Sequence, residues 1–393
     1  MHKYASLIVV FIVAAFLTAC GGSGTTAAKP EYGHPTALAA PNTHMGGAIQ
    51  GTPLVLNNIA SIFTGTPGSE TGFSNYSTPN GPPAAFNHPT DITTDGSNFY
   101  VADYANNSIR KVTSSGIVTT LTCTDAVTGL AITFNLPFAL AINADGTQLY
   151  VVDSGSNTIR IIDIDAANTI YKVTTIGSTT GVAGSVDSTI PSDVRFNRPT
   201  GITTDGENLY VTDSGNNTIR WISIATKAVS TLTGTSGTIG STDGGPHDAR
   251  FNIPQRITTD GTYLYVTDFN NRTIRRIEIL TGNVLTIAGK AGPLETAVDG
   301  IGADARFRQP NGITTDGTYL YVTDSYLNTI RRIGLANPYD VITIPLPDST
   351  LHTPIGITTD GHSLFVADTF IAHQDPVTHI NTYSYSNSII KVQ

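Results

Sequence analysis

The stretch "RPTGITTDGENLYVTDSGNNTIRWI" at residues 198–222 decides the fold, because it recurs along the chain. Close copies occupy residues 253–277 ("IPQRITTDGTYLYVTDFNNRTIRRI") and 309–333 ("QPNGITTDGTYLYVTDSYLNTIRRI"). Three weaker copies, which bring the total to six, begin at His88, Leu136 and Thr353. A period of about fifty residues with strand-forming content predicts a propeller or a linear solenoid.

Each unit has the pattern of three hairpin-forming strands followed by a fourth. In the fourth unit we expect strands at 257–259, 263–268, 273–279 and 284–289. Asp260-Gly261 between the first two predicts a type I′ turn, because these residues accept positive φ. The strand segments are rich in β-branched and aromatic residues, and no useful helical periodicity occurs anywhere. The sequence therefore predicts an all-β fold of four-stranded antiparallel blades.

The two ends of the chain distinguish a closed ring from a solenoid. The sixth unit ends at residues 388–393 ("SIIKVQ") and lacks a fourth strand. Residues 58–65 ("NIASIFTG") match the fourth strands of other units, so we expect them to complete the last blade. A solenoid would instead carry capping repeats. We therefore predict a six-bladed β-propeller whose N-terminal strand closes the ring and removes the open sheet edge.

The first residues are predicted to be a signal and an anchor. Lys3 precedes the apolar run from Leu7 to Phe16, which is too short to span a bilayer comfortably, so residues 1–19 are interpreted as a signal peptide. The sequence Leu17-Thr18-Ala19-Cys20 resembles a bacterial lipobox, which implies lipidation at Cys20 and, with Gly21, the outer membrane. An ordinary signal peptide is the alternative. Residues 20–53 are rich in Gly, Ala, Thr and Pro and are predicted to be a flexible tether before the propeller at 54–393.

Composition narrows the classes of partner. The net charge is −9, and it becomes −10 when Lys3 leaves with the signal. With only 21 Lys and Arg residues, the chain does not suit nucleic acid or anionic lipid head groups, so membrane contact is expected only through the anchor. Cys123, at the end of the predicted fourth strand of the first unit, has no intrachain partner if Cys20 is acylated. We expect it to pack as a small apolar residue, with an intermolecular disulfide or reactive thiol as the alternative.

A family resemblance follows from the repeat. Residues 196–222 ("FNRPTGITTDGENLYVTDSGNNTIRWI") resemble the NHL repeat, and the resemblance extends over about 58–393. It implies a propeller that serves as a platform for protein or RNA, or that acts as a lyase or lactonase in some relatives. The sequence contains no cofactor motif, and we expect no cofactor.

Strand connectivity predicts which loops share a face, and function is expected there. The inter-blade connectors and the loops after the second strands lie on one face, while the Asp-Gly turns lie on the other. On the first face, Asp91 and Arg256 replace the glycine or alanine of other units and are expected to face each other across the channel mouth. There they grip a polar ligand or pair within the structure. Four second-turn loops carry an aromatic residue, whereas two carry Ser154 and Ser214. These aromatics suit protein or glycan contact, or pack on their own blades: Tyr104, Phe269, Tyr326 and Phe370.

Blade six carries an insertion at 369–387 in the same loop, with His373, Asp375 and His379. Their spacing matches no established metal motif, so we predict a recognition loop without a metal. His88 and His352 flank the prolines of neighbouring blades and are the best support for an enzyme, although no catalytic residue is assigned.

A recurring aspartate is predicted to be structural, with the recurring arginine as its partner. Arg110, Arg160, Arg220, Arg275 and Arg331 recur in five units, and Ile390 stands there in the sixth. The six aspartates are Asp103, Asp153, Asp213, Asp268, Asp324 and Asp368.

Three functions follow from these expectations. The first is a membrane-anchored extracytoplasmic binding scaffold. The second is a propeller enzyme of lyase or lactonase type with its site at the channel mouth. The third is a structural role in an envelope assembly, which the sequence does not distinguish from the first.

Overall fold

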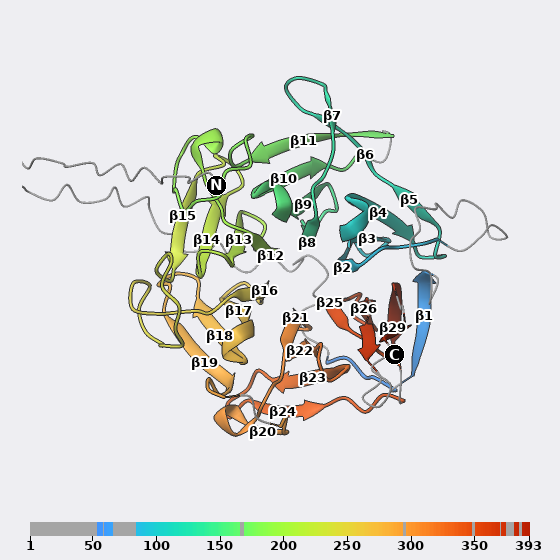
Figure 1. Cartoon of the computed structure of the whole chain (residues 1–393), viewed down its shortest axis with the longest axis vertical. Coiled ribbons are helices and arrows are strands. Elements are labelled where there is room, and N and C mark those ends of the chain that lie inside the picture. The colour runs from blue at the N-terminus through green and yellow to red at the C-terminus, as the bar shows by residue number, and fades with distance from the viewer. Residues whose placement is uncertain are drawn as a thin grey trace, which may run out of the picture. The chain divides into compact units, whose positions relative to one another are not determined.

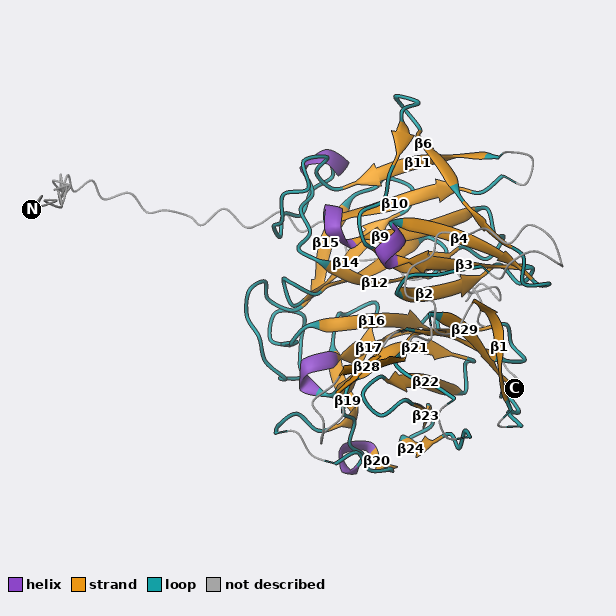
Figure 2. Cartoon of the chain, turned by 45° about the vertical axis from the view of Figure 1, so that its right-hand side comes forward, coloured by secondary structure: helices purple, strands orange, loops and turns teal. Residues whose placement is uncertain are grey.

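The computed structural model describes residues 53–57, 59–65, 84–165, 169–293, 296–347, 350–369, 371–374, 381–384 and 387–393, all within one compact unit at 34–393. Strands dominate this part of the chain, and its only helical elements are short 3₁₀ turns (Figure 2). No helix in these ranges has the length and apolar character needed to cross a membrane.

Six antiparallel sheets surround a central axis, as predicted (Figure 1). Blade one contains β2 (Pro89–Thr94), β3 (Asn98–Asp103), β4 (Ser108–Thr113) and β5 (Val118–Thr120). Blade two contains β8 (Pro137–Ile142), β9 (Gln148–Asp153), β10 (Thr158–Asp163) and β11 (Ile170–Ile176). Blade three contains β12 (Pro199–Thr204), β13 (Asn208–Asp213), β14 (Thr218–Ser223) and β15 (Val229–Thr233).

The remaining blades repeat the pattern. Blade four contains β16 (Pro254–Thr259), β17 (Tyr263–Asp268), β18 (Thr273–Glu278) and β19 (Val284–Gly289). Blade five contains β21 (Pro310–Thr315), β22 (Tyr319–Asp324), β23 (Thr329–Gly334) and β24 (Asp340–Thr343). Blade six contains β25 (Pro354–Thr359), β26 (Leu364–Asp368), β29 (Ser388–Val392) and β1 (Ala60–Gly65). The first strand of every blade lies nearest the axis (Figure 1).

The ring closes through the two ends of the propeller, which confirms the prediction. Strand β1 pairs antiparallel with β29, and Ala60 lies opposite Val392. Outside the sheet, the backbone N–H of Ile59 donates to the carbonyl of Gln393 (3.1 Å), and the N–H of Gln393 returns a bond to Ile59 (2.8 Å). The N-terminal strand is therefore the outer strand of the last blade.

The Asp-Gly turns differ in detail from the predicted type I′ geometry. Of the two residues in blade four, only Gly261 takes a positive φ (+89°). Asp260 instead caps the turn, because its Oδ1 accepts the backbone N–H groups of Thr262 (2.8 Å) and Tyr263 (2.7 Å). The turn is thus stabilised by the side chain of Asp260, whereas the prediction relied on a positive φ at its backbone.

The connectors between blades reach the outer strand of the following blade. Strand β6 (Thr122–Asp125), which β7 (Ala131–Ile132) extends, pairs with β11, and β20 (Gly300–Ile301) pairs with β24. Cys123 therefore lies in β6 on the edge of blade two, so its predicted place at the end of a fourth strand of blade one is wrong. Its side chain is buried, as expected, and burial raises its pKa to about 12.

The hydrophobic core lies between blades rather than within one centre. One cluster joins Val152 and Ile159 of blade two to Leu209 and Val211 of blade three, and equivalent clusters occur around the ring. Alternate strand residues face the two neighbouring blades, which is why the strands are apolar on both sides. The loops at the two ends of the ring are thereby left available for function.

Candidate binding site on the proline face

The face that carries the blade prolines, the connectors and the second-turn loops is called here the proline face. Backbone bonds join the loops to the connectors on it: Ala105 N–H donates to the Asn87 carbonyl (3.0 Å), and Gly155 N–H donates to Asn135 (2.9 Å). The predicted sharing of one face is confirmed. The opposite face carries the Asp-Gly turns and is called the Asp-Gly face.

A narrow channel follows the propeller axis and is closed at the proline face by Arg256. The channel has a volume of about 60 Å³, which suits a few water molecules. Arg256 of blade four extends across the mouth, where its guanidinium donates to the backbone carbonyls of Thr90 and Thr200 in blades one and three. The same group lies 4.4 Å from the ring centroid of Phe138 in blade two. One side chain therefore links four blades.

Asp91 is the acidic partner of this arrangement. It is buried, and its Oδ2 accepts the backbone N–H of Leu140 in blade two (2.8 Å). Burial raises the pKa of Asp91 and lowers the pKa of Arg256, and each shift is opposed by the charge of the other residue. Asp91 and Arg256 both line the channel, and the bonds that they make are bonds within the ring. Their role in holding a ligand stays a prediction.

Close approach of inner strands explains the glycines at the equivalent position of other blades. A Cβ on Gly201 would lie 2.6 Å from the carbonyl oxygen of Gln255 and 2.9 Å from the Cα of Arg256. A Cβ on Gly356 would meet Asp91 in the same way. These glycines let the neighbouring strand pass, whereas Arg256 uses the same position to cross the channel.

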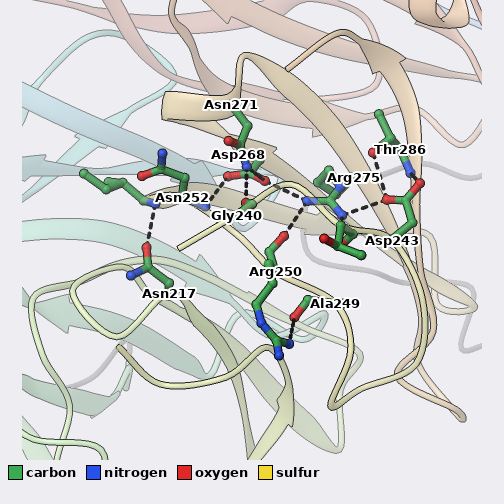
Figure 3. Close-up of polar contacts among 12 residues, drawn as sticks. Asn217, Gly240, Asp243, Ala249, Arg250, Asn252, Asp268, Asn271, Arg275 and Thr286 are labelled. Carbon is green, nitrogen blue, oxygen red and sulfur yellow. Dashed lines mark hydrogen bonds and ion pairs between the residues drawn. The ribbon is translucent and has the colours of Figure 1, made fainter. Parts of the chain in front are cut away.

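The recurring aspartates and arginines form buried ion pairs beneath the proline face, as predicted (Figure 3). In blade four, Asp268 Oδ2 lies 2.7 Å from Arg275 Nη1, and both side chains are inaccessible to solvent. Asp268 also accepts the backbone N–H of Asn252 (2.8 Å) and the amide of Asn271 (2.7 Å). Burial raises the pKa of Asp268 to about 6, although Arg275 and these donors oppose the shift.

The same arginines fasten the connectors. Arg275 Nη2 donates to Asp243 in the connector before blade four (2.7 Å), and Asp243 also accepts the Thr286 hydroxyl of β19 (2.8 Å; Figure 3). Arg220 with Asp187 and Arg331 with Asp299 repeat this contact in blades three and five. The aspartate–arginine groups therefore hold the connectors of blades three, four and five to their blades.

Blade six replaces the missing arginine with a histidine. Ile390 occupies the arginine position, and His352 Nδ1 lies 3.2 Å from Asp368 Oδ2. The hydrogen bond to Asp368 raises the pKa of His352, while burial opposes the shift. Burial lowers the pKa of His88. His88 directly precedes its blade proline and His352 stands two residues before Pro354, so the two histidines do not occupy equivalent positions.

The predicted aromatic residues differ in accessibility. Tyr326 is 56% exposed, and the Arg308 guanidinium lies 3.8 Å from its ring centroid. Tyr104 is half-buried and packs edge-on against Phe138, with 5.7 Å between ring centroids, and Phe269 is half-buried. Cys20, Phe370 and His379 lie outside the described residues. For His373 only the backbone is described, in β27 (Ile371–Gln374), which pairs with β28 (Asn381–Ser384).

Sequence reasoning missed a clasp between blades and the place where the clasp is interrupted. Asn107, Asn157 and Asn217 each accept, through Oδ1, the backbone N–H of the residue before the next blade proline (2.7–2.8 Å). Asn387 of blade six does the same for His88 (3.1 Å). In blades five and six the residues before the proline, Gln309 and Thr353, donate to their own Asp324 and Asp368 instead.

The interruption leaves polar atoms without a partner in one part of the face. The side-chain oxygen of Asn328, at the clasp position of blade five, makes no hydrogen bond in the structure. Other buried atoms without a partner lie nearby in the repeat: Gln255 Oε1, Arg256 Nε, Arg308 Nε, Asn311 Oδ1 and Thr369 Oγ1. These departures are visible in the sequence only after all six units are aligned position by position.

Within the described ranges, no group of three or more His, Cys, Asp or Glu side chains is arranged to hold a metal ion. The polar groups at the mouth of the channel include arginines and amides beside Asp91 and threonine hydroxyls. Arginines and amides bind anions and hydroxyl groups by hydrogen bonding.

Comparison with known proteins agrees with the repeat. The family model described as "NHL repeat" matches residues 196–222. NHL repeat-containing protein 2 of Bos taurus is 30% identical over 159 residues, which cover 37% of this chain and 22% of that protein. Protein SUPPRESSOR OF QUENCHING 1, chloroplastic, of Arabidopsis thaliana is 27% identical over 190 residues, covering 44% and 18%. The chain thus spans about a fifth of the length of the curated relatives that it matches.

Solved structures share the architecture. An auxiliary nutrient binding protein from Bacteroides ovatus superposes with a TM-score of 0.60 at 14% identity, covering 86% of this chain and 77% of that chain. A structural genomics protein of unknown function from Bacteroides thetaiotaomicron gives 0.59 at 19% identity, covering 85% and 75%. At these identities the likeness concerns the fold alone. The chain is thus a six-bladed β-propeller that contains a match to the NHL repeat at residues 196–222.

Proposed function

We propose that the protein is a membrane-anchored extracytoplasmic binding protein that uses the proline face to hold its ligand or partner. The observation that carries the proposal is the closure of the channel mouth by Arg256. Because this side chain blocks entrance to the axis, a ligand meets the outer surface around the mouth. That surface carries the exposed ring of Tyr326 and the half-buried rings of Tyr104 and Phe269.

The anchoring part of the proposal rests on sequence. A lipobox-like segment ending at Cys20 and a tether at 20–53 precede the propeller. Two acyl chains hold a protein stably to a membrane, and a tether of this length allows the propeller to stand away from it. A binding role also agrees with the name of a structural neighbour, an auxiliary nutrient binding protein.

Affinity purification from the native envelope tests the binding role. The full-length protein is crosslinked in cells, purified and analysed for co-purifying proteins and glycans. A variant with Tyr104→Ala, Phe269→Ala and Tyr326→Ala should lose the co-purifying molecule. The control carries Tyr263→Ala and Tyr319→Ala, which remove two aromatic residues from the Asp-Gly face. If only the control loses the partner, the face has been assigned wrongly.

Metabolic labelling with a radioactive fatty acid tests the anchor. The wild-type protein should carry label and sediment with membranes. Cys20→Ser should carry no label and should be released in soluble form. Labelling of the Cys20→Ser variant would contradict the proposed attachment site.

A further inference from the structure

We propose that the proline face of blades four to six binds a carboxylate-bearing saccharide, a glycan that contains uronic acid. This inference rests on the proposed function and gives its ligand a chemical class. The site is called here the acid-sugar site and comprises Gln255, Arg308, Asn311, Tyr326 and Asn328.

The unsatisfied polar atoms are of two kinds. Those in the third strands recur from blade to blade, such as the hydroxyls of Thr158, Thr218 and Thr273, and belong to the common architecture. Those that do not recur are in Gln255, Arg308, Asn311 and Asn328 of the site and, elsewhere, in Trp221, Arg256, Arg332 and Thr369. Asn311 is only 8% exposed, and its Oδ1 still has no partner. A buried polar group without a partner destabilises the protein, which points to a group supplied from outside.

Position in the repeat brings these residues to the mouth of the channel. Gln255 and Asn311 directly follow their blade prolines, as do Thr90, Phe138 and Thr200 in the first three blades. A β-bulge lies at this point of each inner strand and redirects the side chains that follow the proline. Thr200 bonds its neighbouring blade there, through the carbonyl of Gln255 (2.9 Å). Gln255 and Asn311 have no such bond from their side-chain oxygens.

Asn328 became available through the interruption of the clasp. Its counterparts in blades one to three each bind the next blade, whereas the N–H that it would receive, that of Thr353, donates to Asp368 at 2.9 Å. The connector before blade six is short, with ten residues at 344–353. The amide oxygen of Asn328 therefore has no structural duty.

The mixture of orphan groups favours hydroxyls as ligands. Amide oxygens accept hydrogen bonds and an arginine Nε donates one, so the occupant must bring both donors and acceptors within a small area. A hydroxyl group does both. Tyr326 adds an exposed aromatic face beside these groups, and the apolar face of a sugar ring packs on such a surface.

The arginines on the proline face favour an acidic saccharide over a neutral one. The chain carries −9 overall, yet the mouth of the proline face collects arginines. Arg308 stacks on Tyr326, Arg272 donates to the carbonyl of Gly292 (2.9 Å), and Arg198 is exposed on the same face. Asp91 lines the channel, and the charge of Arg256 opposes its own. Arginine binds carboxylates through two parallel hydrogen bonds, so a uronate is favoured over a neutral sugar.

Calorimetric titration of the full-length protein tests the inference. The ligands are oligogalacturonate, oligoalginate and a hyaluronan oligosaccharide, each also in its carboxyl-reduced form. At least one acidic ligand should bind ten-fold or more tightly than its reduced form, and added salt should diminish the difference. Absence of binding by all three ligands, or equal binding of both forms, would overturn the inference.

Matched variants locate the site. Arg308→Gln and Tyr326→Ala should each weaken binding about ten-fold or more, and Asn311→Ala should weaken it several-fold. Blade five offers the same stack on its other face, where Arg332 lies 4.3 Å from the ring centroid of Tyr319. Arg332→Gln and Tyr319→Ala should leave affinity unchanged. Equal losses from both stacks would overturn the assignment.

The results separate this inference from the function on which it rests. If envelope purification finds a partner that depends on the proline face while the acidic sugars do not bind, the ligand class is wrong and the binding face stands. If neither the partner nor the sugars depend on this face, both proposals fail. Thermal unfolding of each variant shows that lost affinity does not reflect a lost fold.

Discussion

His352 Nδ1 lies 3.2 Å from Asp368 Oδ2, in the blade where isoleucine replaces the arginine that partners this aspartate elsewhere. The hydrogen bond to Asp368 raises the pKa of His352. Folded protein then binds this proton more tightly than unfolded protein. The contribution of His352 to the free energy of unfolding is therefore complete below about pH 6.5 and is lost as pH rises through the folded-state pKa.

The His352→Gln variant should lose this pH dependence. Since the side chain is about one-third exposed, solvent screening keeps the effect below about 1 kcal/mol. Urea unfolding measured between pH 5.5 and pH 8.5 checks it, with His362→Gln in an Asp-Gly turn as the control. Identical pH profiles for His352→Gln and the wild type would refute the role of this contact.

The buried arginines should dominate stability. Arg275→Met removes the partner of Asp268 and of Asp243, leaving a carboxylate buried without its cation, and should cost about 3–5 kcal/mol. Arg276→Met is the matched control one residue along, since Arg276 stacks on Tyr263 with 4.4 Å to the ring centroid and should cost about 0.5–1 kcal/mol. Urea unfolding at pH 7 measures both. Similar costs would show that the ion pair adds little.

The pKa of Asp268 adds a pH signature to the same pair. Burial raises it to about 6 in the folded state, from an ordinary value of 3.8. The native state then binds more protons than the unfolded chain between these values, so this group lowers the free energy of unfolding as pH rises from about 4 to about 6. Without Arg275 the pKa should rise further, and the decline should extend above pH 6. A decline confined to the same range in Arg275→Met would contradict the coupling.

Arg256 should contribute strongly to the stability of the ring. Arg256→Met leaves the carbonyls of Thr90 and Thr200 without their donor and Asp91 without its opposite charge. The expected cost is about 3–5 kcal/mol, and the inner strands should exchange amide hydrogens faster because water gains access to the channel. Arg198→Met, on the exposed rim, should stay within about 0.5 kcal/mol of the wild type. Unchanged exchange in Arg256→Met would show that the mouth is closed by something else.

The sequence predicts the closed ring well because the strand and turn pattern of one blade recurs in every unit. Six copies of one unit specify six blades, and the incomplete last copy specifies which strand must come from residues 58–65. The aspartate–arginine pairs were also predictable, since both residues recur at fixed spacing. Cys123 was misplaced because the first connector forms an extra hairpin on blade two, a tertiary choice that no local pattern shows.

The site was less predictable, because it arises from departures that only the fold brings together. Arg256 differs from its counterparts in the other units, and the sequence shows this. That its side chain reaches the carbonyls of Thr90 and Thr200 depends on how narrow the channel is, which only the folded ring reveals. Asn328 looks like its counterparts in other blades. Its amide oxygen makes no bond because the N–H of Thr353, which it would accept, donates to Asp368 instead. The side-chain oxygen of Asn328 is left to bind a ligand because the neighbouring blade donates no hydrogen bond to it. The sequence alone does not reveal a missing hydrogen bond.

Ring closure permits a direct chemical test. Ser61 and Lys391 are register partners in the antiparallel pair of β1 and β29. Directly opposed residues in such a pair have Cα atoms about 4.5–5.5 Å apart, a separation that a disulfide spans. In a Cys20→Ser background, Ser61→Cys with Lys391→Cys should therefore crosslink under mild oxidation.

The crosslinked protein should unfold at a higher urea concentration than its reduced form. Its free energy of unfolding should be larger by about 3–5 kcal/mol, because the disulfide closes most of the propeller into a loop. Ser61→Cys with Lys111→Cys is the control, since Lys111 holds the position of Lys391 in the third strand of blade one. Faster migration on non-reducing gels should appear only for the first pair. Crosslinking of both pairs at equal rates would mean that β1 does not hold its place in blade six, and the assignment of six closed blades would fall with it.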